Sequence, residues 1–158
     1  VEYDYPDSAI TIARQRIASG QLSDKDLSGA CEILGVSHWV KEDYGQAIIA
    51  HSKALELRES IGYESGVGYS YNNLGLNYQE LGDPKMAMLN FLEAQSIAER
   101  KDSSLFAKVL GNIGTLYEEQ GSIDLALEFY GRSLAILELG GDQRIMANTL
   151  NNIALVYK

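Results

Sequence analysis

The apolar and polar positions of this chain follow a helical period. In the segment YNNLGLNYQELGD, Tyr71, Leu74 and Tyr78 recur at i, i+3 and i+7, so they lie on one face of a helix. After a Gly-Asp turn, Ala87 and Phe91 show the same spacing in a second segment. The pattern therefore predicts two helices joined by a short turn, and the alternation typical of a strand fits it poorly.

This unit returns along the chain at a nearly constant interval. Aligned on a small residue of the first helix, the copies are centred on Gly35, Gly75, Gly114 and Ala154, at intervals of 40, 39 and 40 residues. A fixed period of this size is typical of a solenoid, in which each unit buries its apolar face only against its neighbours. Because glycine inside a helix costs roughly 1 kcal/mol relative to alanine, the repeated glycines predict places where two helices cross closely.

These copies resemble the tetratricopeptide repeat family. The family pattern is a bulky residue, two others, Leu-Gly, two others and Tyr, followed by Ala-x-x-x-Phe in the second helix. The chain shows this order from Tyr71 to Phe91 and again from Leu110 to Tyr130. The resemblance covers nearly the whole chain and implies an all-α fold, a right-handed α-solenoid of antiparallel helix pairs with about eight helices. The period of 39 to 40 residues exceeds the usual period of about 34, and it is similar to the long repeats of kinesin light chains and of bacterial diguanylate cyclases and sensor kinases.

One repeat domain is predicted over residues 1–158. Its expected parts are a lone second helix, a degenerate repeat, two regular repeats and a further first helix, at residues 1–22, 23–62, 63–101, 102–141 and 142–158. Asp7 is expected to begin the first helix and Gly20 to end it. Since the apolar residues of the last segment have no second helix to cover them, we expect a fragment of a longer protein, or a missing half that another copy of the chain supplies.

Composition and charge narrow the classes of partner. The formal net charge of −9 argues against nucleic acid or an anionic membrane as the partner. No apolar run is long enough to span a bilayer, and no secretory signal is visible. The single cysteine, Cys31, leaves no internal disulfide framework. We therefore expect a cytoplasmic protein, with a periplasmic location left open.

Patterns of catalytic chemistry are missing from the sequence. It contains no Gly-x-Ser-x-Gly, no phosphate-binding glycine loop and no His-Glu-x-x-His, so no enzymatic activity and no cofactor are expected. A cysteine with two histidines is a zinc-like ligand set, and Cys31, His38 and His51 could converge. Their spacing matches no zinc motif, and all three fall in slots that other repeats fill with core residues. Packing is therefore the favoured interpretation.

Asparagines precede the small residue of three first helices, at Asn72 and Asn73, at Asn112, and at Asn151 and Asn152. Asparagine is a middling helix former whose side chain competes for backbone groups, so its repetition needs a reason. The family resemblance implies that first helices line a concave groove, where the amide can donate to and accept from the backbone of a partner peptide. The alternative left open is that these side chains bond the adjoining repeat or a turn carbonyl.

Helical spacing extends the predicted groove to neighbouring positions. The predicted binding residues are Trp39, Tyr69, Asn72, Asn73, Leu76, Gln79, Lys108, Asn112, Thr115, Glu118, Glu119, Asn148, Asn151 and Asn152, and the same spacing includes Lys158. Trp39, the only tryptophan, is either a groove anchor or a cover for the N-terminal helix.

The function predicted from these features is protein–protein interaction, with a peptide or a partner domain bound in the groove. By resemblance the chain would be the sensory or scaffold region of a bacterial signalling protein. Self-association as a homo-oligomer through the unfinished C-terminal repeat is one alternative, and a peptide pheromone receptor domain is another.

Overall fold

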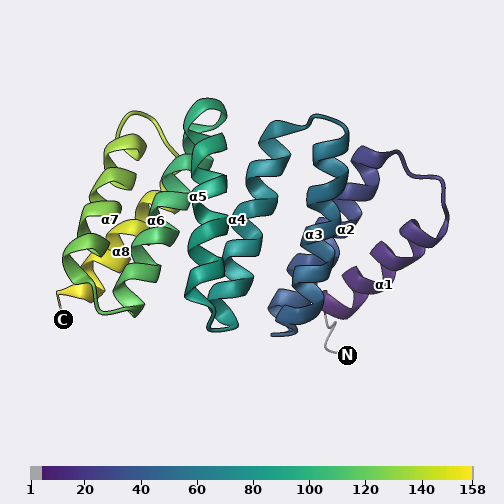
Figure 1. Ribbon diagram of the computed structural model, residues 1–158, viewed down its shortest axis with the longest axis horizontal. Helices are drawn as coiled ribbons and strands as arrows, with labels where there is room; N and C mark the ends of the chain where they lie inside the picture. Colours follow the sequence, from purple (N-terminus) through teal and green to yellow (C-terminus); the bar gives the residue numbers. More distant parts are fainter. Residues whose placement is uncertain (1–4, 158) are drawn as a thin grey trace.

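The computed structural model describes residues 5–157, which form eight helices and no strand. The helices are α1 (Tyr5–Ala18), α2 (Asp24–Val40), α3 (Tyr44–Ser60), α4 (Glu64–Glu80), α5 (Pro84–Lys101), α6 (Ser103–Glu119), α7 (Ile123–Leu137) and α8 (Gln143–Val156). They follow one another along the long axis of the molecule, with α1 at one end and α7 and α8 at the other (Figure 1). The predicted all-α solenoid is confirmed.

Each helix packs mainly against the helices next to it in sequence. The closest partners are α2 with α3, α4 with α5, and α6 with α7, while α1 packs on α2, α3 on α4, α5 on α6 and α7 on α8. The first helices of successive pairs also meet, α4 with α6 and α6 with α8. Core burial in this arrangement depends on neighbouring units, as expected of a solenoid. None of the described helices has the length and apolar character needed to cross a membrane.

The turn inside each pair follows the chemistry of its residues. After α4, Gly82 adopts a left-handed φ of 74°, which glycine reaches without strain. The side chain of Asp83 then accepts a hydrogen bond from the backbone N–H of Met86 at 3.0 Å, and Pro84 opens α5. In the degenerate repeat the equivalent turn position is Glu42, with φ 59°, which is uncommon for a residue with a side chain.

An aromatic ring of the second helix lies directly on the small residue of the first helix. The three pairs are His51 on Gly35, Phe91 on Gly75 and Tyr130 on Gly114. A Cβ added to any of these glycines would lie 2.5 to 2.7 Å from ring atoms, closer than real carbon contacts allow. All three rings are buried. The close crossing predicted from the glycines is therefore confirmed, and its partner is the ring.

The first helix begins earlier than the sequence suggested. It starts at Tyr5 rather than at Asp7, because Pro6 fits the first turn, where its missing N–H has no hydrogen-bond partner to lose. Its end agrees with the prediction, since α1 stops at Ala18 and Gly20 has φ 65°.

Candidate functional site

Three surface hollows lie next to one another along the first helices. The central hollow, between α2 and α4, is lined by Val36, Trp39, His51, Asn73, Leu76, Asn77 and Lys108. The C-terminal hollow, between α4, α6 and α8, shares Lys108 and adds Tyr69, Ser104, Arg144 and Asn148. The N-terminal hollow, between α1 and α2, shares Val36 and adds Tyr5, Ala9, Ile33 and Val40. The shared residues make the hollows one continuous face, which we call the first-helix face.

The central hollow brings several predicted binding residues together. Trp39 of α2, Asn73 and Leu76 of α4, and Lys108 of α6 all line it, although they are distant in sequence. The Trp39 side chain is 39% exposed, so part of its ring is open to a partner. The lining is mostly apolar with a few polar groups, which is the usual character of a ligand site.

The asparagines have different surroundings. Asn72 is fully buried, and its Oδ1 accepts a hydrogen bond from Nδ2 of Asn112 at 2.8 Å. Asn152 donates from Nδ2 to the hydroxyl of Thr115 at 3.4 Å. These bonds join α4 to α6 and α6 to α8, which is the alternative that the sequence left open. Asn73 is half-buried and lines the central hollow. Within residues 5–157, the one hydrogen bond to its Oδ1 is a long bond of 3.5 Å from Nδ2 of Asn72.

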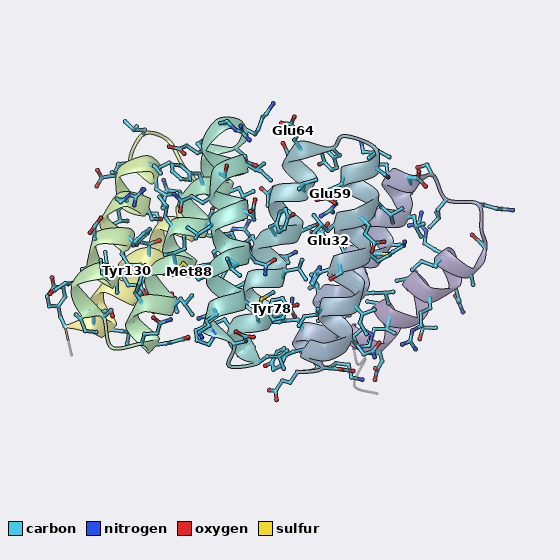
Figure 2. The ribbon with its side chains drawn as sticks, in the orientation of Figure 1. Glu32, Glu59, Glu64, Tyr78, Met88 and Tyr130 are labelled. Carbon is cyan, nitrogen blue, oxygen red and sulfur yellow. The ribbon has the colours of Figure 1, made fainter. Side chains whose placement is uncertain are left out.

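The predicted residues near the C-terminal ends of α4 and α6 bond within the protein. Gln79 donates from Nε2 to Oε1 of Glu119 at 2.7 Å. The hydroxyl of Tyr130, a residue of α7 labelled in Figure 2, donates to Oε2 of Glu118 at 2.6 Å and lies 3.1 Å from the hydroxyl of Thr115. Burial, followed by the bond to Glu118, raises the pKa of Tyr130 to about 12. These side chains therefore connect neighbouring helices within the fold.

The remaining predicted residues lie toward α8. Tyr69 and Asn148 line the C-terminal hollow, and the Tyr69 hydroxyl donates to Oδ2 of Asp102 at 3.1 Å. Asn151 is exposed on α8. Lys158 lies outside the described residues.

Cys31, His38 and His51 do not gather into a ligand set. Cys31 and His38 line a separate hollow with residues of α1 and α3, whereas His51 lies on Gly35 and borders the central hollow. Nowhere in residues 5–157 do three His, Cys, Asp or Glu side chains come close enough to hold a metal ion. Burial raises the pKa of the Cys31 thiol. Burial also lowers the pKa of His51 to about 4, so this ring is neutral at physiological pH.

The sequence analysis did not predict an ion pair between Arg58 and Glu32, of which Glu32 lines the N-terminal hollow. Arg58 of α3 is 5% exposed, and its guanidinium pairs with the carboxylate of Glu32 on α2. It also donates to Oγ of Ser70 at 2.9 Å and to the carbonyl oxygen of Gly66 at 3.1 Å, both on α4. Figure 2 shows Glu32 well away from the α7 end of the molecule, where Tyr130 lies. One side chain thus joins three successive helices.

The sequence did carry a signal for this pair. The slot of Arg58 is held one and two repeats later by Ala98 and Leu137, which are both buried. A long charged residue in a slot that is otherwise apolar indicates a buried ion pair, because a lone charge cannot be buried cheaply.

Comparison with known proteins places these helices among repeat proteins. A family model described as tetratricopeptide repeat matches residues 30–100 and 105–158. The chain is 29% identical over 101 residues to a heat shock protein sti1 homolog of Schizosaccharomyces pombe, which is 64% of this chain and 16% of that protein. It is 25% identical over 105 residues to response regulator aspartate phosphatase I of Bacillus subtilis, which is 66% of this chain and 27% of that protein. The matched segment is thus less than a third of either relative.

Two solved structures share the fold at low sequence identity. BtubC (BKLC) from P. vanneervenii superposes with a TM-score of 0.83 at 22% identity, covering 98% of this chain and 66% of that one. The apo form of RapI superposes with a TM-score of 0.76 at 20% identity, covering 98% of this chain and 42% of that one. At these identities the likeness establishes the arrangement of helices and nothing about ligands.

Proposed function

This chain belongs to the tetratricopeptide repeat family, and we propose that it is a non-enzymatic interaction module whose first-helix face binds a peptide or a segment of a partner protein. The observation that carries the proposal is the central hollow, where apolar side chains surround an asparagine whose Oδ1 accepts no short hydrogen bond from the residues that the structure describes.

The apolar part of the central hollow would supply most of the affinity. Val36 is 46% exposed and Trp39 is 39% exposed on adjacent turns of α2, and Leu76 of α4 faces the same hollow. Tryptophan is enriched among residues that dominate binding energy, because its large ring loses much water contact on burial. A partner side chain placed between Trp39 and Leu76 would bury apolar surface on both sides.

The polar part would fix the direction of the bound segment. The amide of Asn73 can both donate and accept, so it suits one peptide group of a partner backbone. Lys108 borders the same hollow from α6 and offers a cationic donor to a carbonyl or carboxylate oxygen. With a net charge of −9, the protein repels polyanions as a whole, so we propose a protein partner rather than nucleic acid or an anionic membrane.

A peptide selection tests this proposal directly. A phage-displayed library of random peptides is selected on the chain, and the enriched peptides are measured by fluorescence anisotropy against variants Trp39→Ala and Asn73→Ala. We expect about tenfold or greater loss of affinity for Trp39→Ala and a smaller loss for Asn73→Ala. Ile49→Ala is the matched control, because Ile49 is 63% exposed on α3 and away from the central hollow. Unchanged binding by both variants refutes the assignment of the site.

We further propose that the module serves as the sensory or scaffold part of a bacterial signalling protein in the cytoplasm. Support comes from the Bacillus subtilis relative, whose name describes a response regulator aspartate phosphatase. The test is the complete reading frame that contains these residues. A signalling domain in it supports the proposal, and a complete frame without one overturns it.

A further inference from the structure

Asn77 is a polar residue at a repeat position that is apolar one repeat later. The equivalent position of α6 holds Leu116, which belongs to the main core cluster. Asn77 is 1% exposed, and its Nδ2 donates to the backbone carbonyl oxygen of Asn73 in the same helix at 2.6 Å. Its Oδ1 is buried and accepts no hydrogen bond from residues 5–157. A buried acceptor without a partner costs free energy, so this oxygen needs an explanation.

The central hollow contains a second buried polar group of this kind. His51 is 2% exposed, lines the hollow together with Asn77, and has an Nδ1 with which no described residue pairs. Burial lowers the pKa of this ring to about 4, so it carries no charge at neutral pH. A neutral imidazole offers one donor and one acceptor. The hollow therefore holds two uncharged polar groups that can each make a further hydrogen bond.

The burial of the lining residues sets the order in which an entering side chain would meet them. Val36 and Trp39 are partly exposed, whereas Asn77 and His51 are almost fully buried. The apolar surface thus lies toward solvent, and the unpaired polar groups lie deeper. The side chain that complements this arrangement has an apolar body and a hydrogen-bonding group at its tip.

The size of the hollow suits a single large side chain. Its volume is about 260 Å³, which is the liquid volume of roughly nine water molecules at about 30 Å³ each. Serine and threonine carry a hydroxyl on a stem too short to cover the apolar walls. Tyrosine has a side chain of the required size, in which an apolar ring ends in a hydroxyl.

A charged tip fits the hollow less well than a hydroxyl. Lys108 lines the same hollow and repels a cation, and neither Asn77 nor the neutral His51 supplies the negative charge that a buried cation needs. A carboxylate only accepts hydrogen bonds, so it cannot pair with Oδ1 of Asn77. A hydroxyl both donates and accepts, and it loses far less hydration on burial than an ion does.

We propose that the central hollow is a specificity pocket for one tyrosine side chain of the partner, whose hydroxyl donates to Oδ1 of Asn77 while its ring packs between Trp39 and Leu76. The inference rests on the proposed function, because it names the residue that the bound segment places in the hollow. Aromatic rings gain from packing beside one another in offset or tilted arrangements, and Trp39 supplies the second ring.

Phenylalanine is the analogue that separates the ring from the hydroxyl. It would fill the same space and leave the Asn77 amide unpaired and cut off from water. A site built around a hydrogen bond discriminates against the analogue that lacks it, because the buried polar group of the site stays unpaired. We expect tyrosine to bind about tenfold more tightly than phenylalanine.

The amides of N-acetyl-tyrosine, N-acetyl-phenylalanine and N-acetyl-lysine are the probes that measure this preference. Trp39 is the only tryptophan of the chain, so its indole N–H gives a single signal in the NMR spectrum of the isotope-labelled protein. We expect the tyrosine amide to shift this signal with a dissociation constant on the order of 1 mM. The phenylalanine amide should bind about tenfold more weakly, and the lysine amide more weakly than the tyrosine amide.

Asn77→Leu removes the acceptor, and Leu116 shows that leucine fits this repeat position. The preference for tyrosine over phenylalanine should fall to about twofold or less in this variant. Asn90→Leu is the matched control, because Asn90 is also buried and donates to the carbonyl oxygen of Met86 in its own helix at 2.8 Å, but does not line the hollow. This control should keep the tenfold preference. Circular dichroism checks the fold of both variants, and the comparison of the three amides on the unmodified chain needs no variant.

Several results would overturn the inference. Equal binding of the tyrosine and phenylalanine amides to the unmodified chain would mean that water satisfies Asn77. Tighter binding of the lysine amide, or a preference for tyrosine that persists unchanged in Asn77→Leu, also contradicts it. So does a Trp39 signal that no amide shifts up to about 20 mM, well above the expected dissociation constant. The proposed function is tested separately, by the selected peptides and the variant Trp39→Ala, and it survives each of these results.

Discussion

Replacing Gly75 by alanine is the sharpest test of the packing described above, because two physical effects oppose each other at this position. Alanine is favoured over glycine inside a helix by roughly 1 kcal/mol, so helix propensity alone predicts a gain. The new Cβ, however, would lie 2.5 Å from Cδ1 and Cε1 of Phe91, and this ring is fully buried. Steric conflict therefore opposes the propensity gain.

The size of the conflict can be worked out from the distance. An ordinary carbon contact begins near 3.4 Å, so the Phe91 ring or one of the helices α4 and α5 must move by roughly 1 Å, taking the difference from contact distance. Interiors are close-packed, and inserting a methyl group into such a core costs about 1–3 kcal/mol. After the propensity gain of roughly 1 kcal/mol is subtracted, we expect Gly75→Ala to lose up to about 2 kcal/mol of the free energy of unfolding.

Urea unfolding monitored by circular dichroism measures this loss. The midpoint of the unfolding transition and the slope of the free energy against urea concentration are compared between variants. Gly131→Ala is the matched control, because Gly131 also lies inside a helix, α7, but nothing approaches its added Cβ within 4 Å. That variant should gain up to about 1 kcal/mol. A double variant with Phe91→Leu should recover part of the Gly75→Ala loss. If Gly75→Ala were as stable as Gly131→Ala, the steric reasoning would be refuted.

Two further predictions concern buried polar groups. His51 stays neutral in the fold down to a pH of about 4, while in the unfolded chain it binds a proton below about pH 6.5. The unfolded state thus binds more protons in this window, and stability is lost as pH falls from 6.5 toward 4. His51→Phe places in this position the residue that Phe91 supplies one repeat later, and it should remove up to about 3 kcal/mol of this loss. The free energy of unfolding of the variant and of the unmodified chain is measured by urea unfolding at several pH values. An equal pH dependence in both proteins would contradict the burial of His51. Arg58→Met should destabilise the fold by about 3 kcal/mol, since Glu32 and Ser70 lose their partner. A midpoint of thermal unfolding equal to that of the unmodified chain would contradict the bridging role.

The helix pairs could be predicted because the size of the side chain at each repeat position is determined by how the two helices pack. Gly75 stands out in the sequence because glycine inside a helix costs stability, so its presence predicts a close packing contact. In the structure, the ring of Phe91 makes that contact. The turn at Gly82 and Asp83 could also be predicted. Glycine adopts the left-handed backbone and aspartate caps the next helix, and neither role depends on distant helices.

The candidate site was only partly predictable. Asn72 and Asn73 are adjacent in sequence, and adjacent helix residues point about 100° apart, yet the pattern alone did not show which one faces outward. The bond from Asn112 to Asn72 depends on how α4 and α6 lie against each other, which no local pattern specifies. Arg58 was missed for a different reason. Its role in a buried ion pair is indicated only when its repeat position is compared with the equivalent positions, Ala98 and Leu137.

The bridge made by Arg58 also bears on how the solenoid comes apart. Between α3 and α4 it stands in place of the apolar contacts that Ala98, Leu105 and Val109 make one repeat later, in the main core cluster. The free energy of unfolding of a repeat array is close to a sum of the stabilities of its units and of the interfaces between neighbours. A polar interface between α3 and α4 therefore weakens the cooperativity of unfolding across it. Amide hydrogen exchange should therefore separate two blocks, α1–α3 and α4–α7, with faster opening in the first.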